Sequence, residues 1–329
     1  MKKVLSLMLA ASTLLSLSSC GGKAAAETAD SVTDSAEIPV VYYIRDITPE
    51  NLVKIYEALG RPAEGNNVGV KISTGESNKS NHLSPALIEP LVKKVNGTLI
   101  ECNTAYNGNR MSTEDHLRAA EEHGYTAIAR VDIMDAEGDT ILPVDSARHI
   151  THDIVGRHFL DYDFLVVLSH FKGHAMGGFG GALKNVAIGI ASTAGKTNIH
   201  TAGKTDNASE LWGNLPEQDD FLESMAEACQ AVFKHTGDKV LFINVANNLS
   251  VDCDCDANPD APQMGDLGIL ASLDPVALDR ACVDMVYNST DSGKVHLIER
   301  IESRHGTHIL DYGEQIGLGS QKYRLVEIK

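Results

Sequence analysis

Basic residues are scarce in this sequence. Its 329 residues include 28 lysines and arginines against 45 aspartates and glutamates, so the formal net charge at pH 7 is −17. Proteins that bind nucleic acid, or that hold a membrane through a basic face, concentrate positive charge. We therefore expect no nucleic-acid partner and no basic membrane-binding face, and any local cluster of cations becomes informative.

Several familiar signatures are missing as well. Of the six cysteines, Cys20 is predicted below to carry a lipid, and the five that remain are an odd number, which is a poor disulfide framework for an exported protein. The chain contains neither G-x-x-x-x-G-K-[ST] nor a clean G-x-G-x-x-G, which removes the two commonest phosphate-loop signatures. No internal repeat occurs at the periods of solenoid proteins.

The N-terminal residues form a targeting segment. Lys2 and Lys3 precede a mostly apolar run, residues 4–17, that is too short to be a stable membrane-spanning helix. Residues 17–20, Leu-Ser-Ser-Cys, look like a bacterial lipobox. We predict a lipoprotein signal peptide over residues 1–19, acylation of Cys20, and a location in the cell envelope facing the periplasm, with the lipid as the membrane anchor. An ordinary cleaved signal peptide is the alternative.

Residues 20–37 are small, polar and acidic, which predicts a flexible tether. Residues 38–329 are long enough for a single α/β domain or two interlocked lobes. Apolar runs of strand length alternate with helical patterns, which predicts a largely parallel sheet with helices on both faces and antiparallel additions near the C-terminus. The expected strands are residues 40–45, 68–73, 97–102, 127–132, 140–144, 148–154, 164–168, 240–245, 267–271, 309–312 and 323–328. The expected helices are residues 49–60, 85–96, 112–124, 221–235, 275–287 and 295–305.

The stretch from residue 161 to residue 196 holds the best candidate site. A buried strand, residues 164–168, ends in the cationic group His170, Lys172 and His174 and then in a glycine-rich turn. Glycines allow backbone N–H groups to approach an anion, and a helix N-terminus adds its dipole. Such turns also occur for packing alone, but the clustered cations favour a ligand. The residues that we assign to the ligand from this turn and the helix after it are Gly178, Gly180, Gly181, Lys184 and Asn185.

Three further loops follow strands and carry polar side chains. One begins at Lys71, the second runs from Glu101 through Arg110 to His116, and the third holds Cys253 and Cys255. Loops that follow parallel strands meet at one edge of a sheet. We therefore expect these loops and the glycine-rich turn to share one crevice.

The C-x-C pair, Cys253 and Cys255, has three open interpretations. The two thiols could bind a metal ion together with His170 or His174, form a disulfide, or stay free. Cys102, Cys229 and Cys282 occur in apolar patterns and are expected to be small core residues.

Several motifs in a fixed order resemble one known family, the uncharacterised Fe–S centre proteins of domain-of-unknown-function family 362. The matching segments are residues 70–76, 101–110, 116–124, 170–185, 253–255 and 271–279. Glu101 and Cys102 stand where the family usually has Asp and Thr. The ferredoxin-like insert of many members would fall within residues 191–221, which contain no cysteine, so we expect no ferredoxin-type clusters. The resemblance implies a shared fold and pocket with a metal or metal cofactor.

These observations lead to one main functional hypothesis and two alternatives. The main hypothesis is an enzyme of redox or acid–base type with a metal site and a basic pocket for a small anion. Lys71, Arg110, Lys172 and Lys184 would hold the anion, and Lys172, His116 and His123 would be the catalytic groups, since imidazole titrates near neutral pH. The alternatives are a non-catalytic binding protein for a small carboxylate or phosphate, and a scaffold lipoprotein that keeps the fold alone.

Overall fold

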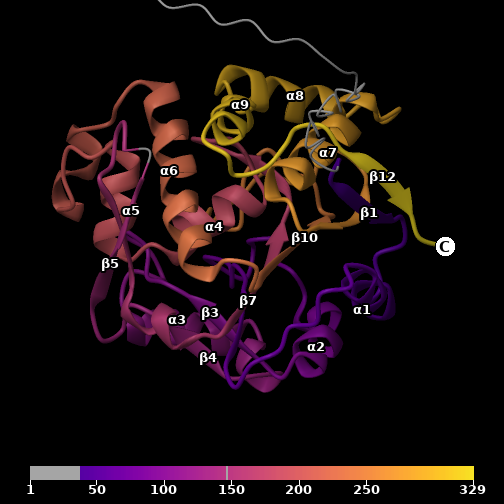
Figure 1. The fold of residues 1–329 in the computed structure, drawn as a ribbon, viewed down its shortest axis with the longest axis horizontal. Helices are drawn as coiled ribbons and strands as arrows, with labels where there is room; N and C mark the ends of the chain where they lie inside the picture. The colour runs from indigo at the N-terminus through magenta and orange to yellow at the C-terminus, as the bar shows by residue number, and fades with distance from the viewer. Residues whose placement is uncertain (1–37, 146) are drawn as a thin grey trace, which may run out of the picture. The chain divides into compact units, whose positions relative to one another are not determined.

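The computed structural model of the chain describes residues 38–145 and 147–329. The expected signal peptide, Cys20 and the tether lie outside these residues. Residues Ile38–Lys329 form one compact unit, drawn in Figure 1. Within the part that the structure describes, no helix is both long and apolar enough to cross a membrane.

The strands are β1 (Val40–Ile44), β2 (Val68–Lys71), β3 (Gly97–Glu101), β4 (Val131–Ile133), β5 (Asp139–Pro143), β6 (His152–Gly156), β7 (Phe164–His170), β8 (Lys172–His174), β9 (Gly178–Gly180), β10 (Val240–Ala246), β11 (Gly268–Ser272) and β12 (Arg324–Glu327). The α-helices are α1 (Pro49–Ala58), α2 (Pro85–Lys94), α3 (Thr113–Glu122), α4 (Ala182–Ile190), α5 (Thr193–His200), α6 (Gln218–Thr236), α7 (Pro275–Asn288), α8 (Lys294–Ser303) and α9 (His308–Gln315). Short 3-10 turns occur at Tyr125–Ala127, Arg157–Asp161 and Ala208–Gly213.

The main sheet has the strand order β12-β1-β11-β10-β7-β2-β3-β4. β10, β7, β2, β3 and β4 run parallel to one another, whereas β11 is antiparallel to both of its neighbours, β10 and β1. Two small hairpins, β5–β6 and β8–β9, stand outside the sheet. The predicted fold class, a largely parallel sheet with an antiparallel addition late in the chain, is confirmed.

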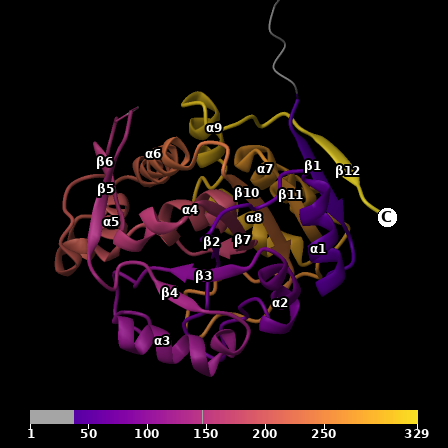
Figure 2. The same cartoon turned by 60° about the horizontal axis from the view of Figure 1, so that its bottom comes forward.

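Helices cover both faces because the central strands bury both faces. Along β7, Leu165 and Val167 enter one apolar core with residues of α4, α6 and α7. Val166 and Leu168 enter a second core with residues of α1 and α2. Figure 2 shows α6 and α7 on one side of the sheet and α2 and α3 on the other. A strand buried on both sides has a continuous apolar run in place of an alternating pattern.

Local chemistry sets the helix starts that the sequence indicated. The Thr48 side chain accepts a hydrogen bond from the backbone N–H of Asn51 at 3.2 Å, and Pro49 opens α1. Asp274 caps α7 in the same way, at 2.8 Å from the N–H of Ala277. An N-cap acceptor followed by proline satisfies the unpaired N–H groups at a helix start.

One expected strand near the C-terminus was wrong. Residues 309–312 belong to helix α9, not to a strand, because Ile309, Leu310 and Tyr312 turn one side of a helix toward the core. The final strand β12 is parallel to β1, so the antiparallel addition is β11, which lies inside the sheet.

Candidate functional site

A cavity of about 820 Å³ opens where β2, β3, β7 and β10 end. Lys71, Glu101 and His170 are the last residues of three of these strands, and each lines the cavity. The predicted meeting of the four polar loops is confirmed, because Arg110, Lys184 and the two cysteines of the C-x-C pair also line it. The loops meet because the strands are parallel, so their carboxyl ends lie at the same end of the sheet.

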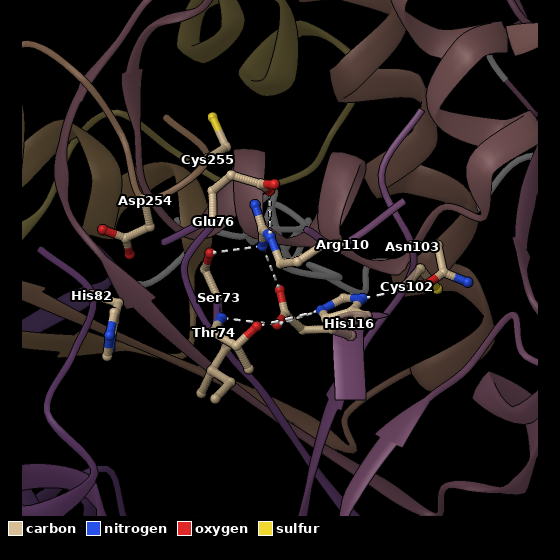
Figure 3. A network of polar contacts seen from close by, with 12 residues as sticks. Ser73, Thr74, Glu76, His82, Cys102, Asn103, Arg110, His116, Asp254 and Cys255 are labelled. Carbon is tan, nitrogen blue, oxygen red and sulfur yellow. Dashed lines mark hydrogen bonds and ion pairs between the residues drawn. The ribbon is translucent and has the colours of Figure 1, made fainter. Parts of the chain in front are cut away.

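Arg110 is held by two glutamates of the cavity wall. Its Nε lies 2.9 Å from Glu76 Oε2 and its Nη1 lies 3.2 Å from Glu101 Oε1, and all three side chains are buried. Figure 3 shows Arg110 joined to Glu76 and to the Ser73 hydroxyl. Arg110 was predicted to help hold an anion, and the structure shows that its charge is already compensated by two carboxylates.

His116 and His123 lie behind the cavity wall and are not among the residues that line it. Nε2 of His116 is 3.2 Å from Glu101 Oε2, and Nδ1 of His123 donates to the Thr74 carbonyl at 2.7 Å. Burial alone would raise the pKa of Glu101, but His116 and Arg110 hold it well below its usual range. The two histidines, predicted to be catalytic groups, thus support the wall of the cavity and do not line it.

Lys172 and His170 form a buried ionic group with Asp254. Lys172 Nζ is 2.6 Å from Asp254 Oδ1, off the ideal hydrogen-bond direction. His170 Nδ1 lies 3.1 Å from the same carboxylate, and its Nε2 lies 2.7 Å from the Asn247 carbonyl. Burial would raise the pKa of Asp254, yet His170 and Lys172 keep it well below its usual range. Both ring nitrogens of His170 lie within hydrogen-bond distance of protein oxygen atoms, so both are engaged within the protein.

Three other lysines line the cavity without a carboxylate partner. Within the described residues, no Asp or Glu oxygen lies within 4.0 Å of the ammonium groups of Lys71, Lys184 and Lys196. Lys71 bonds the Ile72 carbonyl and Asn185 Oδ1, and Lys196 bonds the carbonyls of Ala191 and Cys102. Burial lowers the pKa of both Lys71 and Lys184 to about 8. Both therefore remain mostly protonated at neutral pH.

The glycine-rich turn positions this lysine group but does not itself hold an open anion site. Gly180 and Gly181 line the cavity, whereas Gly178 does not. The first N–H groups of α4, those of Ala182 and Leu183, already donate to the carboxylate of Asp279 at 2.8 and 3.0 Å. The helix N-terminus that was expected to receive a ligand is thus occupied by the protein's own carboxylate.

Asn185, in the first part of α4, connects this helix to the ends of β2 and β7 through hydrogen bonds. Its Nδ2 donates to the Lys71 carbonyl, the Leu168 carbonyl and the Ser169 hydroxyl at 3.1–3.3 Å. Because its Oδ1 also accepts from Lys71, every polar atom of its amide is engaged within the protein. Asn185 orients Lys71 and is not a free ligand contact.

The C-x-C pair is a disulfide in this structure, which was one of the three interpretations open from the sequence. A ring nitrogen of His174 and both sulfur atoms lie within 4.8 Å of one another, so this group could hold a metal ion once the cysteines are thiolates. His174 Nδ1 accepts the N–H of Gly177 at 2.8 Å, and burial keeps its pKa well below its usual range. A bridge that closes only three residues contributes roughly 1.6 kcal/mol by chain entropy, about half the value for a 15-residue loop.

The cavity residues that sequence reasoning missed include Lys196 and His200. Both lie on α5 at a spacing of four residues, which places them on one face of a helix. That spacing was the available signal, but the surrounding residues are too polar to show a helical pattern. His200 donates from Nδ1 to the Lys196 carbonyl at 2.7 Å, and burial lowers its pKa to about 4.

Comparison with known proteins adds a family and two structural likenesses. The family model of the domain of unknown function DUF362 matches residues 68–284. A protein from Thermotoga maritima is similar with a TM-score of 0.41 and 14% identity, over 81% of this chain and 58% of that one. The lactate racemase apoprotein from Thermoanaerobacterium thermosaccharolyticum has a TM-score of 0.36 and 16% identity, over 63% of this chain and 50% of that one. No curated protein matches the sequence.

Proposed function

We propose that this chain, which belongs to the DUF362 family, binds a small carboxylate or phosphate in its lysine-lined cavity. The observation that carries the proposal is the convergence of Lys71, Lys184 and Lys196 on one cavity without a carboxylate partner among the described residues. Buried charges are costly unless they are paired. An anion of the right size supplies the missing partner.

The size and lining of the cavity support this proposal. A volume of about 820 Å³ falls in the range of small-molecule pockets. Two other cations of the wall, Arg110 and Lys172, are neutralised by Glu76, Glu101 and Asp254. Arg304 also lines the cavity but is exposed, so solvent screens its charge. A ligand therefore experiences mainly the field of the three unpaired lysines.

The proposal includes a metal ion beside the anion. His174, Cys253 and Cys255 are the residues that would hold it, in the reduced protein. Three protein ligands leave a coordination position open, and a divalent ion there would polarise an oxygen of a bound carboxylate or phosphate. His170 is not part of this set, because both of its ring nitrogens are engaged with oxygen atoms of the protein.

The alternative is a binding protein without catalysis. One observation favours it: the residues expected to transfer protons, Lys172, His116 and His123, are all engaged within the protein. An acid–base enzyme built on this cavity would instead use Lys71 or Lys184, whose pKa of about 8 lies near neutral pH.

Calorimetric titration with phosphate and with succinate tests the anion site. The full-length chain and the variants Lys184→Gln and Lys204→Gln are compared. Lys204 is exposed and does not line the cavity, so it is a control with the same change in net charge. We expect Lys184→Gln to weaken binding roughly tenfold or more and Lys204→Gln to leave it unchanged. Equal binding by both variants, or no binding by wild type, would reject the proposal.

A cell-envelope location completes the proposal. It is supported by the lipobox at residues 17–20, and it places the cavity outside the cytoplasm, where disulfides persist.

A further inference from the structure

We propose that the Cys253–Cys255 disulfide is a reaction site for small anionic thiols, which the cavity lysines attract. The protein would thereby exchange electrons with thiols that carry a carboxylate or phosphate group. This inference rests on the anion-binding function proposed above and names its substrate class.

The first support is the shared location. Both cysteines line the same cavity as Lys71, Lys184 and Lys196. A thiol that enters through attraction of its acidic group is therefore brought to the cavity that contains the disulfide. Access and local thiolate concentration are two of the quantities that set the rate of thiol–disulfide exchange.

The two sulfur atoms differ in their surroundings. Cys253 is 8% exposed, whereas Cys255 is only partly buried. The backbone N–H of Cys255 donates to Cys253 Sγ at 3.3 Å, and a donor at sulfur stabilises a thiolate and makes it a better leaving group. These contacts select Cys255 Sγ as the atom attacked and Cys253 Sγ as the leaving group.

The acidic residues around the C-x-C pair do not cancel the attraction. Asp254 is paired with Lys172 at 2.6 Å, and Asp252 is paired with Arg300 at 3.2 Å. Asp256 is exposed and is screened by water and salt. The unpaired lysines thus set the sign of the field inside the cavity.

The reaction has two balanced steps. A thiolate RS⁻ attacks Cys255 Sγ, an R–S–Sγ bond forms, the Sγ–Sγ bond breaks, and its electron pair stays on Cys253 as thiolate. A second RS⁻ attacks the R-bearing sulfur, releases RSSR and leaves Cys255 as thiolate. The two protons lost by the thiols return to the cysteines or to water. The protein disulfide gains two electrons, and two thiols are oxidised.

Reduction by three thiols of different charge tests the proposal. The full-length oxidised protein is treated with 3-mercaptopropionate, 2-mercaptoethanol or cysteamine, and the peptide that contains both cysteines is followed by alkylation and mass spectrometry. Rates are divided by thiolate concentration to remove the difference in thiol acidity. We expect 3-mercaptopropionate to react roughly tenfold faster than 2-mercaptoethanol and cysteamine to react slowest. Added propionate and high salt should each reduce the advantage.

The lysine variants decide whether the cavity is the cause. The preference for the anionic thiol should fall in Lys184→Gln and remain in Lys204→Gln. Equal rates for the three thiols, a disulfide that none of them reduces, or a preference that survives Lys184→Gln would each overturn the proposal. Calorimetry on the same oxidised samples separates the two hypotheses: phosphate or succinate binding without thiol selectivity rejects only the exchange reaction, and the loss of both rejects the anion site as well.

Discussion

The ammonium group of Lys172 lies 2.6 Å from a carboxylate oxygen of Asp254, with both side chains at least 95% buried. Lys172 opens the short hairpin β8–β9, and Asp254 stands between the two cysteines of the C-x-C pair. The pair joins the glycine-rich turn to the cysteine loop, and His170 shares the same carboxylate. One buried carboxylate therefore holds together two of the loops that form the cavity.

Replacement of Asp254 by asparagine should destabilise the fold. The substitution leaves the buried ammonium of Lys172 without its counter-charge, which typically costs about 3–5 kcal/mol. Urea unfolding at pH 7 measures the change, with Asp256→Asn, an exposed neighbour, as the control that should stay close to wild type. Because the folded-state pKa of Asp254 is depressed, its contribution is complete above its ordinary value of 3.8 and disappears as pH falls through the folded-state pKa. A variant as stable as wild type at pH 7 would contradict the assigned ion pair.

Anion binding should weaken as pH rises through 8. The pKa of Lys71 and of Lys184 is about 8, and only the protonated amines attract an anion. Above this pH each lysine that must be protonated reduces affinity by roughly tenfold per pH unit. Calorimetry with succinate at pH 6.5, 7.5 and 9 measures the dependence, and Lys184→Gln should show a shallower slope. A constant affinity across this range would show that neither lysine takes part.

A thiophilic metal should bind only the reduced protein. Reduction converts Cys253 and Cys255 into the two thiolates that His174 needs as co-ligands. We expect one Zn²⁺ per chain after reduction and removal of the reductant, and none in the oxidised protein or in the Cys253→Ser, Cys255→Ser variant. Elemental analysis gives the stoichiometry. Equal zinc in the double variant would place the metal elsewhere.

Cys20 should carry the membrane anchor. Labelling of cells with a fatty acid should mark wild type and leave Cys20→Ser unmarked, and the wild-type protein should sediment with membranes. Cys102→Ser, a change at a buried cysteine of the α/β unit, serves as the control that keeps its label. Label on both Cys20→Ser and wild type would refute acylation at this position.

The fold could be predicted where short-range chemistry decides it. Thr48 and Asp274 cap helices through their own side chains, so a few adjacent residues are enough to predict where these helices begin. Residues 309–312 lacked such a signal, because a short group with three apolar residues, Ile309, Leu310 and Tyr312, suits a strand or one turn of a helix equally well. Helix α5 was missed because its residues pack through small and polar side chains, with Lys196 and Thr197 among those buried.

The site could be located from the sequence, but its pairings could not. Strand direction determines which loops meet, so Lys71, Lys184 and Cys253 were placed at one cavity in advance. Which charges neutralise one another depends on side chains far apart in the chain: Arg110 lies 34 residues from Glu76, and His170 lies 84 from Asp254. The unpaired lysines became identifiable only after the paired cations were known.

The reversed direction of β11 has a consequence for the cysteine loop. Neighbouring parallel strands need a crossover connection that leads from the end of one strand back to the start of the next. Neighbouring antiparallel strands can instead be joined by a loop at one end of the sheet. Because β11 runs antiparallel to β10, residues 247–267 join the two strands at the end of the sheet where the cavity lies. The buried Leu249 and the ion-paired Asp254 fix part of this loop, whereas exposed positions such as Asp260 could change without altering the strand order. The exposed part of the loop that holds the C-x-C pair could therefore vary without a change in the order of the strands in the sheet.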